Sequence, residues 1–490
     1  MEPNKRARKE LRRCVALLDM DCFYVAVERE LDPTLRGVPV AVAQYTAGAP
    51  LVAVSYEAKA LGVKRGMLSH DAQVKFPELR ISKIQTKNGK ADLNKYRQAS
   101  DRVIAVACRF CPVIEKASVD EFYLDLSNLL DQTEGEDLEE EEDLEEDEAL
   151  ANTLVCTGFD TVTQEPIQDL LLRRACRMVW EIRRAIRDEL GFDCSAGIAG
   201  NKFLAKSIAG IRKPFTQIAL PTEHVSSVCA TLPIQKAKSL GGKRGEQLME
   251  QYDELKMLGD LRVVVGAAKL CEIFGQREGN RLVKLSVGED DTAVSRTTMH
   301  KSMAASKMFR GKAVLTSRGE IARWMNMLVL EIIERLGEDG RRPATIIAGV
   351  WGLGSRSTST FTWPLTVQSL NALANALLDR LLERMETLKV HSLSLTLAGF
   401  PSENLMENNA VVALGKWTCK LCTLENDLEW LRCDACGSDK LGHVTAVSAP
   451  PPALATPVVT AVGTTWTCGH CTFAGNDLRF LRCEVCGLSK

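Results

Sequence analysis

Apolar and polar positions follow two different periods along the first 210 residues. Residues 14–18 form a short apolar run that ends at Asp19, which predicts a buried strand. Residues 118–126 alternate over part of their length and predict a second strand or a hairpin. Over residues 166–190 the apolar positions recur at helical spacing and Gly191 supplies a stop, which predicts an amphipathic helix.

A further strand at 193–199 and a short helix at 201–209 are expected next. The order strand, helix, hairpin, helix, strand is the split βαβ arrangement, so the sequence predicts an α+β core. Residues 222–290 predict mostly short helices, and a Gly-rich turn at 240–245 opens one of them. Exposed amides at such a turn can hold a phosphate, although a plain turn between helices explains the pattern almost as well. Residues 300–400 mix strands with two helices, at about 318–336 and 368–388.

Charge changes the picture in one segment. Residues 134–148 hold 12 acidic and no basic residues, so we expect a solvated, disordered insertion over about 131–150. Without those 12 charges the formal net charge of −2 becomes +10, which suits a nucleic-acid-binding protein but also many other enzymes. Residues 1–13 form a basic tail, which indicates a nuclear import signal, a loose phosphate contact or a solvated disordered end.

Composition argues against a membrane or secreted protein. No window approaches ~18 uninterrupted apolar residues, and the N-terminus lacks a secretory pattern. Of the 17 cysteines, eight lie in two clusters near the C-terminus and nine are scattered through the first 271 residues. We interpret the scattered nine as reduced thiols of an intracellular protein, most of them acting as small buried apolar residues.

Three carboxylates are candidates for a metal site. Asp19 ends the first predicted strand, and Asp120 and Glu121 lie in the second. Neighbouring side chains on a regular strand point to opposite faces, so the backbone must turn or bulge for both to serve one site. Carboxylates at one sheet end could hold two Mg²⁺ ions, which stabilise both oxygens of a phosphoryl transfer. From spacing alone, ordinary surface acids are the more frequent explanation.

A series of motifs, in the same order along the chain, resembles those of Y-family DNA polymerases. They occupy residues 18–28 (LDMDCFYVAVE), 53–63 (AVSYEAKALGV), 117–126 (ASVDEFYLDL), 194–206 (CSAGIAGNKFLAK) with Lys213-Pro214, and 239–243 (SLGGK). The resemblance covers roughly residues 14–400. Cys22, the Gln44-Tyr45 pair and the Leu-Gly-Gly-Lys turn are similar to the eta branch of that family.

The resemblance implies an α+β right-hand polymerase with a split-βαβ palm, small fingers, a helical thumb and an α/β little finger. The implied boundaries are 14–25 and 90–221 for the palm, 26–89 for the fingers, 222–295 for the thumb and 300–400 for the little finger. In the little finger, plausible contacts to DNA phosphates are Lys307, Arg310, Lys312 and Arg356, and a solvated charged face is an equal alternative for each.

The resemblance also implies roles for individual residues. Asp19, Asp120 and Glu121 become the catalytic metal ligands, and the carbonyl of Met20 completes the site of the nucleotide-side Mg²⁺.

Eight further residues are implied to bind the nucleotide. Cys22 and Phe23 would offer backbone amides to the triphosphate, and Tyr24 would lie under the sugar and exclude a ribose 2′-hydroxyl. The β- and γ-phosphates would be bound by Tyr56, Lys59 and Lys213, and the templating and incoming bases would be touched by Gln44 and Arg65.

The C-terminal part holds an internal repeat. Residues 417–440 and 466–490 are similar to each other, and a linker at 441–465 separates them. Each repeat carries two Cys-x-x-Cys pairs, the pattern of a closed, structural Zn²⁺ site, so we expect two Zn²⁺ ions. The expected ligands are Cys419, Cys422, Cys433 and Cys436 in finger 1 (415–440), and Cys468, Cys471, Cys483 and Cys486 in finger 2 (466–490).

Both fingers resemble the Ran-binding-protein type, whose members read either ubiquitin or single-stranded RNA. Ubiquitin readers carry Thr-Phe after the second cysteine, and finger 2 matches with Thr472, Phe473 and the apolar Val485. Finger 1, with Thr423 and Leu424, is a softer match. No arginine ladder for RNA is evident, so ubiquitin on a sliding clamp is the expected partner.

These features together predict a nuclear DNA-directed DNA polymerase that copies past bulky or crosslinked template bases such as ultraviolet photoproducts. Its expected partners are primer–template DNA, deoxynucleoside triphosphates and ubiquitin, with no membrane. One alternative is another branch of the family, a kappa-like enzyme or a deoxycytidyl transferase. Another is an inactive, ubiquitin-reading scaffold on DNA, against which the presence of all three carboxylates argues.

Overall fold

The computed structural model describes residues 13–45, 48–87, 89–128, 147–237, 239–296, 301–351, 355–360, 367–385 and 387–400, and four short strands between 416 and 477. The chain divides into two compact units, Met1–Glu403 and Asn404–Lys490. A helix that is both long and apolar enough for a membrane span is not found among the described residues.

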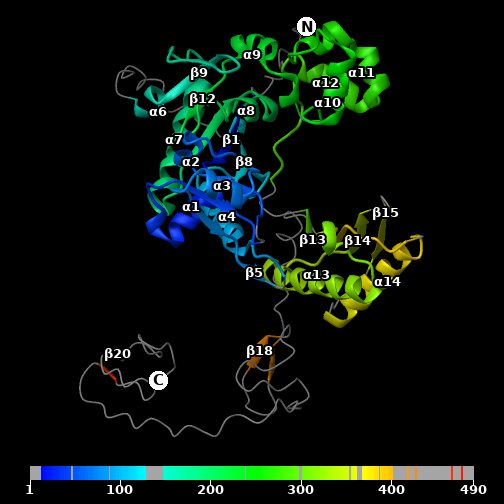
Figure 1. Ribbon diagram of the computed structural model, residues 1–490. Coiled ribbons are helices and arrows are strands. Elements are labelled where there is room, and N and C mark those ends of the chain that lie inside the picture. Colours follow the sequence, from blue (N-terminus) through cyan, green and yellow to red (C-terminus); the bar gives the residue numbers. More distant parts are fainter. Residues whose placement is uncertain are drawn as a thin grey trace, which may run out of the picture. The chain divides into compact units, whose positions relative to one another are not determined.

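A seven-stranded sheet forms the centre of the first unit (Figure 1). In spatial order its strands are β10 (Thr161–Thr163), β9 (Thr153–Gly158), β12 (Gln217–Ala219), β11 (Cys194–Ala199), β1 (Val15–Met20), β8 (Glu121–Asp125) and β7 (Ile114–Lys116). Strand β12 runs parallel to both of its neighbours, and all the other pairs are antiparallel. The three strands predicted for the core are confirmed as the adjacent strands β11, β1 and β8.

Alternating side chains of β1 belong to two hydrophobic cores. Leu18 and Met20 are buried on one face, together with side chains of α4 (Asn94–Ala107) and α7 (Leu170–Leu190). Leu17 is buried on the other face, against α8 (Lys202–Ile208). Because side chains alternate along a strand, Asp19 belongs to the α8 face, one residue from the end of β1.

The predicted helices are confirmed, with shifted ends. Helix α7 begins at Leu170 rather than near 166, because the Asp169 side chain accepts hydrogen bonds from its first amides at 2.9 and 3.2 Å. It ends where expected, at Gly191, whose φ of 69° lies in the left-handed region that glycine adopts without strain.

The predicted range of the acidic insertion, about 131–150, is too long at its C-terminal end. Asp147 caps a short helix, α6 (Glu148–Ala151), and its side chain accepts from the amides of Ala149 and Leu150. A carboxylate is favourable at a helix N-terminus, so residues 147–150 fold instead of continuing the charged segment. Residues 129–146 lie outside the described residues.

A smaller subdomain follows the first strand. Side chains between Ala41 and Leu79 form a hydrophobic core of its own, whereas the buried side chains of residues 23–27 belong to the core of the central sheet. Its elements are α1 (Phe23–Leu31), η1 (Pro33–Leu35), α2 (Tyr56–Ala60), α3 (Ser69–Lys75), a sheet in the order β3 (Leu51–Val54), β2 (Val40–Ala43) and β4 (Arg80–Lys83), and the hairpin of β5 (Thr86–Lys87) and β6 (Lys90–Ala91).

Two further groups of elements complete the first unit. The expected short helices are confirmed as η2 (Thr222–His224), α9 (Val225–Thr231), η3 (Ile234–Lys236), α10 (Lys243–Gln251), η4 (Leu261–Val265), α11 (Ala267–Phe274) and α12 (Gln276–Leu285). The expected mixture of strands and two helices is an antiparallel sheet in the order β13 (Ser302–Met308), β16 (Ser392–Ala398), β14 (Thr345–Trp351) and β15 (Ser355–Thr360), with η5 (Gly311–Ala313), α13 (Arg318–Asp339) and α14 (Val367–Leu382).

The second unit shows the internal repeat in its backbone. Strand β17 (Lys416–Thr418) pairs with β18 (Glu425–Asp427), and β19 (Thr465–Trp466) pairs with β20 (Asn476–Asp477). In both pairs a tryptophan lies opposite an asparagine. The eight cysteines expected to bind zinc, and the residues expected to bind ubiquitin, lie outside the described residues.

The nine cysteines among the described residues are free thiols, and most are buried, as predicted. Burial raises the pKa of Cys14 to about 12 and that of Cys111 to about 11. At neutral pH both thiols are therefore uncharged and behave as small apolar side chains.

Candidate active site

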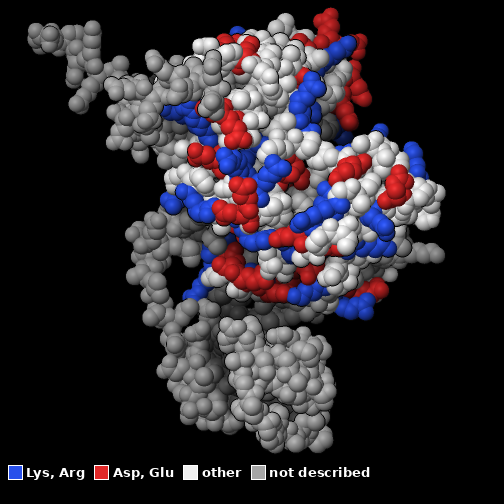
Figure 2. Space-filling view, turned by 90° about the vertical axis from the view of Figure 1, so that its left-hand side faces the viewer, with Lys and Arg blue, Asp and Glu red and all other residues white. Residues whose placement is uncertain are grey.

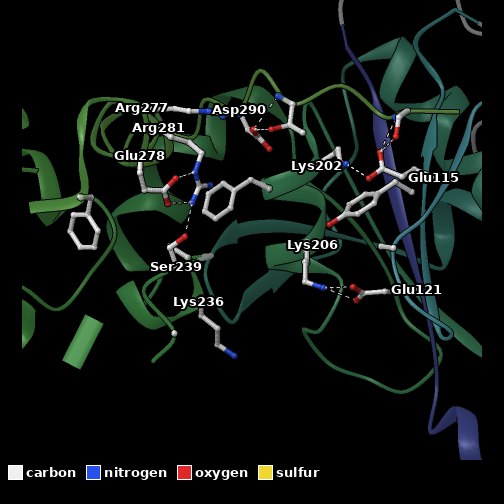
Figure 3. Close-up of a pocket in the computed structure, with 18 of the residues that line it drawn as sticks. Glu115, Glu121, Lys202, Lys206, Lys236, Ser239, Arg277, Glu278, Arg281 and Asp290 are labelled. Atoms are coloured by element: carbon white, nitrogen blue, oxygen red, sulfur yellow. Dashed lines mark hydrogen bonds and ion pairs between the residues drawn. The ribbon is translucent and has the colours of Figure 1, made fainter. Parts of the chain in front are cut away.

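Asp19 and Glu121 lie directly opposite each other across the β1–β8 pair. Opposed side chains of an antiparallel pair point to the same face, so both carboxylates lie on the α8 face at the end of β1. Lys206 of α8 donates to both carboxylate oxygens of Glu121, at 2.7 and 2.6 Å (Figure 3). Strand register, and not closeness in sequence, brings these two acids together.

Asp120 directly precedes β8 and does not lie within it, which corrects the prediction that both acids belong to the strand. The Ser118 hydroxyl accepts from the amides of Asp120 and Glu121 at 3.2 and 3.1 Å, and it donates to the Asp120 carboxylate. The Met20 amide donates to the Asp120 carbonyl at 2.8 Å. This turn provides the departure from strand geometry that two adjacent acids need in order to serve one site.

The three carboxylates lie within electrostatic reach of one another. Burial is the main cause that raises the pKa of Asp19, and the charges of Asp120 and Glu121 raise it further. The Lys213 ammonium, 2.6 Å from an Asp19 oxygen, acts in the opposite direction. Lys213 follows α8, so the same face of the sheet supplies both the acids and their partner cations.

The chemistry of this donor set fits Mg²⁺, which prefers carboxylate oxygens. Asp19 and Glu121 each already hold an ammonium group at 2.6 Å, so this edge of the sheet attracts positive charge. As their side chains stand, the described residues contain no group of three or more Asp, Glu, His or Cys side chains gathered around one metal position. Lys206 and Lys213 hold two of the three acids in their present positions.

The chain turns sharply from β1 into α1. Cys22 has φ 48°, and this left-handed conformation places the first turn of α1, with Phe23 and Tyr24, directly after the end of the strand. The first amides of a helix have no partner inside it, so they can bind an anion there. The Tyr24 ring stacks on Tyr96, with the ring centroids 4.0 Å apart and the planes 9° apart.

The three residues expected to bind phosphates come together beside this turn. The Tyr56 hydroxyl donates to the carboxylate of Asp21 at 3.0 Å. The Lys59 ammonium lies 4.1 Å from the centroid of the Tyr56 ring and 3.5 Å from the Cys22 sulfur. The Lys213 ammonium lies 3.6 Å from an Asp21 oxygen. No role was predicted for Asp21, although the residue lies within the first motif.

The residues expected to touch the bases are less tightly tied to the site. Arg65 is exposed, but it is close enough to Tyr24 to oppose the rise in that residue's pKa, which burial mainly causes. Gln44 lies exposed directly after β2.

Of the little-finger cations expected to contact DNA, Lys307 has partners inside the chain. Its ammonium donates to the Tyr45 hydroxyl and, at 3.0 Å, to the Gly89 carbonyl. Arg310 is exposed, and the side chains of Lys312 and Arg356 lie outside the described residues.

A cleft of about 1400 Å³ extends from Glu121 to the helical segment. Figure 3 shows Lys202 and Lys206 on one side of it, and Lys236, Arg277 and Arg281 on the other. Gly241 and Gly242 of the Gly-rich turn also line it. Acidic side chains line the cleft as well: Glu115 pairs with Lys202, Glu121 with Lys206 and Glu278 with Arg281. Figure 2 shows basic and acidic side chains interleaved in the same way on one face of the molecule. The cleft is therefore a candidate site for a polyanion because it lies beside Glu121 and carries cations such as Lys236 and Arg277, although its lining is not uniformly basic.

Two family models match the chain over the regions that form this architecture. The model of the impB/mucB/samB family matches residues 18–210, and the model of that family's C-terminal domain matches residues 300–409. The two matches together cover more than half of the chain, which therefore belongs to the impB/mucB/samB family, the Y-family of DNA polymerases.

Individual relatives agree with this assignment. DNA polymerase eta of Arabidopsis thaliana is 36% identical over 342 residues, which cover 67% of this chain and 50% of the relative. DNA polymerase eta of Drosophila melanogaster is 33% identical, over 67% of this chain and 40% of the relative. DNA polymerase iota of Homo sapiens is 29% identical, over 68% and 43%. The alignments thus span half or less of each of these relatives.

A third model, the zinc finger found in Ran-binding protein and others, matches residues 415–442. Finger 1 is therefore a zinc finger of this type. The match does not extend to residues 466–490, so finger 2 remains a prediction from the cysteine spacing.

Proposed function

We propose that this chain is a template-directed DNA polymerase that performs translesion synthesis by two-metal nucleotidyl transfer. The observation that carries the proposal is the placement of Asp19, Asp120 and Glu121 at one end of the β1–β8 pair, within electrostatic reach of one another and beside the start of a helix. Glu121 also lines the cleft. Such an arrangement suits phosphoryl transfer, because the protein's contribution to that reaction is mainly to position the reactants and to stabilise charge.

In this mechanism, Asp19, Asp120, Glu121 and the Met20 carbonyl would hold two Mg²⁺ ions, which lower the pKa of the primer 3′-hydroxyl and neutralise charge on the triphosphate. Ser118 holds Asp120 in place through its hydroxyl. The first amides of α1 would receive the triphosphate, and Tyr56, Lys59 and Lys213 lie beside them to bind its terminal phosphates.

The remaining site residues act on selectivity. Tyr24 is held flat against Tyr96, so its ring would form a rigid floor under the sugar and exclude a 2′-hydroxyl. Gln44 and Arg65, both exposed, would face the template and incoming bases. The primer–template would lie in the cleft, where lysines and arginines on both sides, several of them paired with acids, would contact its phosphates.

The finer assignment is to the eta branch, with template bases crosslinked by ultraviolet light as the substrate class. Its support is the identity to two polymerases named eta and the motif residues Cys22 and Gln44-Tyr45. We further propose nuclear action and recruitment by ubiquitin on a sliding clamp. Finger 2 would bind ubiquitin through Thr472, Phe473 and Val485, and finger 1, with Thr423 and Leu424, would bind more weakly.

Primer extension with Mg²⁺ tests the proposal. The full chain should extend a primer on undamaged DNA and past a template thymine dimer. Asp120→Ala should abolish extension and leave DNA affinity nearly unchanged, because the cations that line the cleft remain. A wild-type protein that extends no primer would favour the scaffold alternative, and one that stops at the dimer would favour another branch of the family.

A further inference from the structure

Asp21 is a buried carboxylate at the meeting point of three chain segments. Its side chain is 3% exposed and follows the end of β1. Its Oδ2 accepts from the Ser195 hydroxyl at 2.9 Å and from the Phe215 amide at 2.8 Å. Its Oδ1 accepts from the Tyr56 hydroxyl at 3.0 Å and lies 3.6 Å from the Lys213 ammonium.

The two oxygens of Asp21 differ in what holds them. Oδ2 is bound by the Ser195 hydroxyl of β11 and by the Phe215 amide of the loop before β12. Neither of these two groups has a proposed role towards the substrate. Oδ1 is bound by the side chains of Tyr56 and Lys213, the residues expected to bind phosphate, and more weakly by Ser195 at 3.1 Å. Oδ1 can therefore exchange partners while Oδ2 keeps the carboxylate satisfied.

A phosphate group needs the same donors that Oδ1 uses. Tyr56 has one O–H, and it donates to Asp21. Lys213 has three N–H groups, which face Asp19 Oδ1 at 2.6 Å, the Asp19 carbonyl at 3.3 Å and Asp21 Oδ1 at 3.6 Å. Fully ionised phosphate oxygens only accept hydrogen bonds, so a phosphate can be bound by Tyr56 only after that hydroxyl leaves Asp21.

We propose that Asp21 is an internal competitor of the nucleotide's terminal phosphates, which lowers the affinity of the site for a triphosphate by holding the Tyr56 hydroxyl and sharing Lys213. The inference rests on the proposed nucleotide site. Its consequence is that a triphosphate binds by exchange with a carboxylate of the protein, so that part of its binding energy is used to release these donors.

Asp21→Asn separates competition from a merely structural role. The asparagine oxygen can still accept from Ser195 and Phe215, while its NH₂ group donates to the Tyr56 oxygen and frees the phenolic proton for a phosphate. Binding of inorganic triphosphate to the full chain is measured by calorimetry in EDTA, so that metal binding does not contribute. Asp21→Asn should bind it about tenfold more tightly than the wild type, the equivalent of one charge-assisted hydrogen bond.

The matched control is Asp147→Asn. Asp147 is another largely buried carboxylate that accepts from a cation and from backbone amides, but its partners are Arg177 and the first turn of α6. This variant should lose thermal stability and keep its triphosphate affinity within about twofold of the wild type. A variant that only loosens the fold has no reason to bind an anion more tightly.

Tyr56→Phe shows whether the hydroxyl carries the effect. In that background the gain from Asp21→Asn should shrink to about threefold, the part that acts through Lys213. Asp21→Ser should also bind triphosphate more tightly than the wild type, and it replaces Asp21→Asn if that variant does not fold.

Unchanged or weaker triphosphate binding by Asp21→Asn would overturn the inference, as would an equal gain in both tyrosine backgrounds or no binding by any variant. Primer extension by the wild type is scored separately. If extension fails while Asp21→Asn binds more tightly, the polymerase proposal is wrong and the competition stands.

Discussion

Replacing Gly197 by alanine tests how closely α8 packs on the central sheet. A Cβ atom on Gly197 of β11 would lie 2.2 Å from the Ala205 carbonyl oxygen and 2.7 Å from the Ala209 nitrogen, both backbone atoms. Carbon and carbonyl oxygen come no closer than about 3.3 Å in ordinary contacts, so α8 would have to move by roughly 1 Å. Because no side-chain rotation can relieve this overlap, we expect Gly197→Ala to lower the free energy of unfolding by about 3 kcal/mol, the upper end of overpacking costs.

The same displacement should reach the active site. Helix α8 carries Lys206, whose ammonium is 2.6 Å from Glu121, and Lys202, whose ammonium is 2.6 Å from Glu115. A shift of α8 away from β11 changes both pairs at the edge of the cleft. Primer extension by Gly197→Ala should therefore fall at a temperature where the protein is still folded.

The effect on stability is measured by denaturant-induced unfolding, followed by the circular dichroism of the helices. The control is Gly210→Ala in the turn after α8, because a Cβ there meets nothing within 4 Å and the residue has no positive φ. It should stay within about 0.5 kcal/mol of the wild type. If the two variants unfold at the same denaturant concentration, the close approach of α8 to β11 does not exist and the reasoning fails.

Three further predictions address other parts of the molecule. Ser118→Ala removes the hydroxyl that holds Asp120, so kcat for primer extension should fall by about tenfold with DNA affinity unchanged, and an unaltered kcat would count against the turn. Burial pushes the pKa of Glu115 up, but hydrogen bonds from Lys202 and Ser295 outweigh it and hold that pKa below its ordinary value of 4.5. Its stabilising effect is therefore complete above pH 4.5 and is lost as the pH falls through the lowered pKa. Glu115→Gln should accordingly be less stable than the wild type by about 1–2 kcal/mol at pH 7, and the difference should shrink as the pH falls below 4.5. A difference that stays constant with pH would contradict this. Phe473→Ala should weaken ubiquitin binding in a pull-down with little effect on primer extension, and unchanged binding would show that finger 2 does not read ubiquitin in the way we propose.

Much of the fold could be predicted from the sequence because its signals are local. The apolar run before Asp19, the helical spacing before Gly191 and the short helices after residue 222 each reflect a period that a few neighbouring residues set. The errors lie at the ends of the predicted segments, where a single capping residue decides which residue begins a helix. Asp169 delays the start of α7, and Asp147 ends the charged insertion early, because one side chain can satisfy the first free amides of a helix.

For the site, the sequence could predict only which residues are candidates, and it did so mainly through the resemblance to a known family. Spacing alone could not bring Asp19 to Glu121, because strand register is set by long-range pairing. The sequence also left open how Asp120 and Glu121 could serve one site, and the hydroxyl of Ser118 resolves this through the turn at residues 118–121.

By itself, therefore, the sequence determined which residues carry charge, where strands and helices form, and that the tail carries paired cysteines, since these depend on residue type and local spacing. Only the tertiary structure decided that Asp21 lies buried between Tyr56, Ser195 and Phe215, residues up to 194 positions away in the chain. Burial and hydrogen-bond partners are properties of the packed molecule, because they depend on segments that meet only when the chain folds.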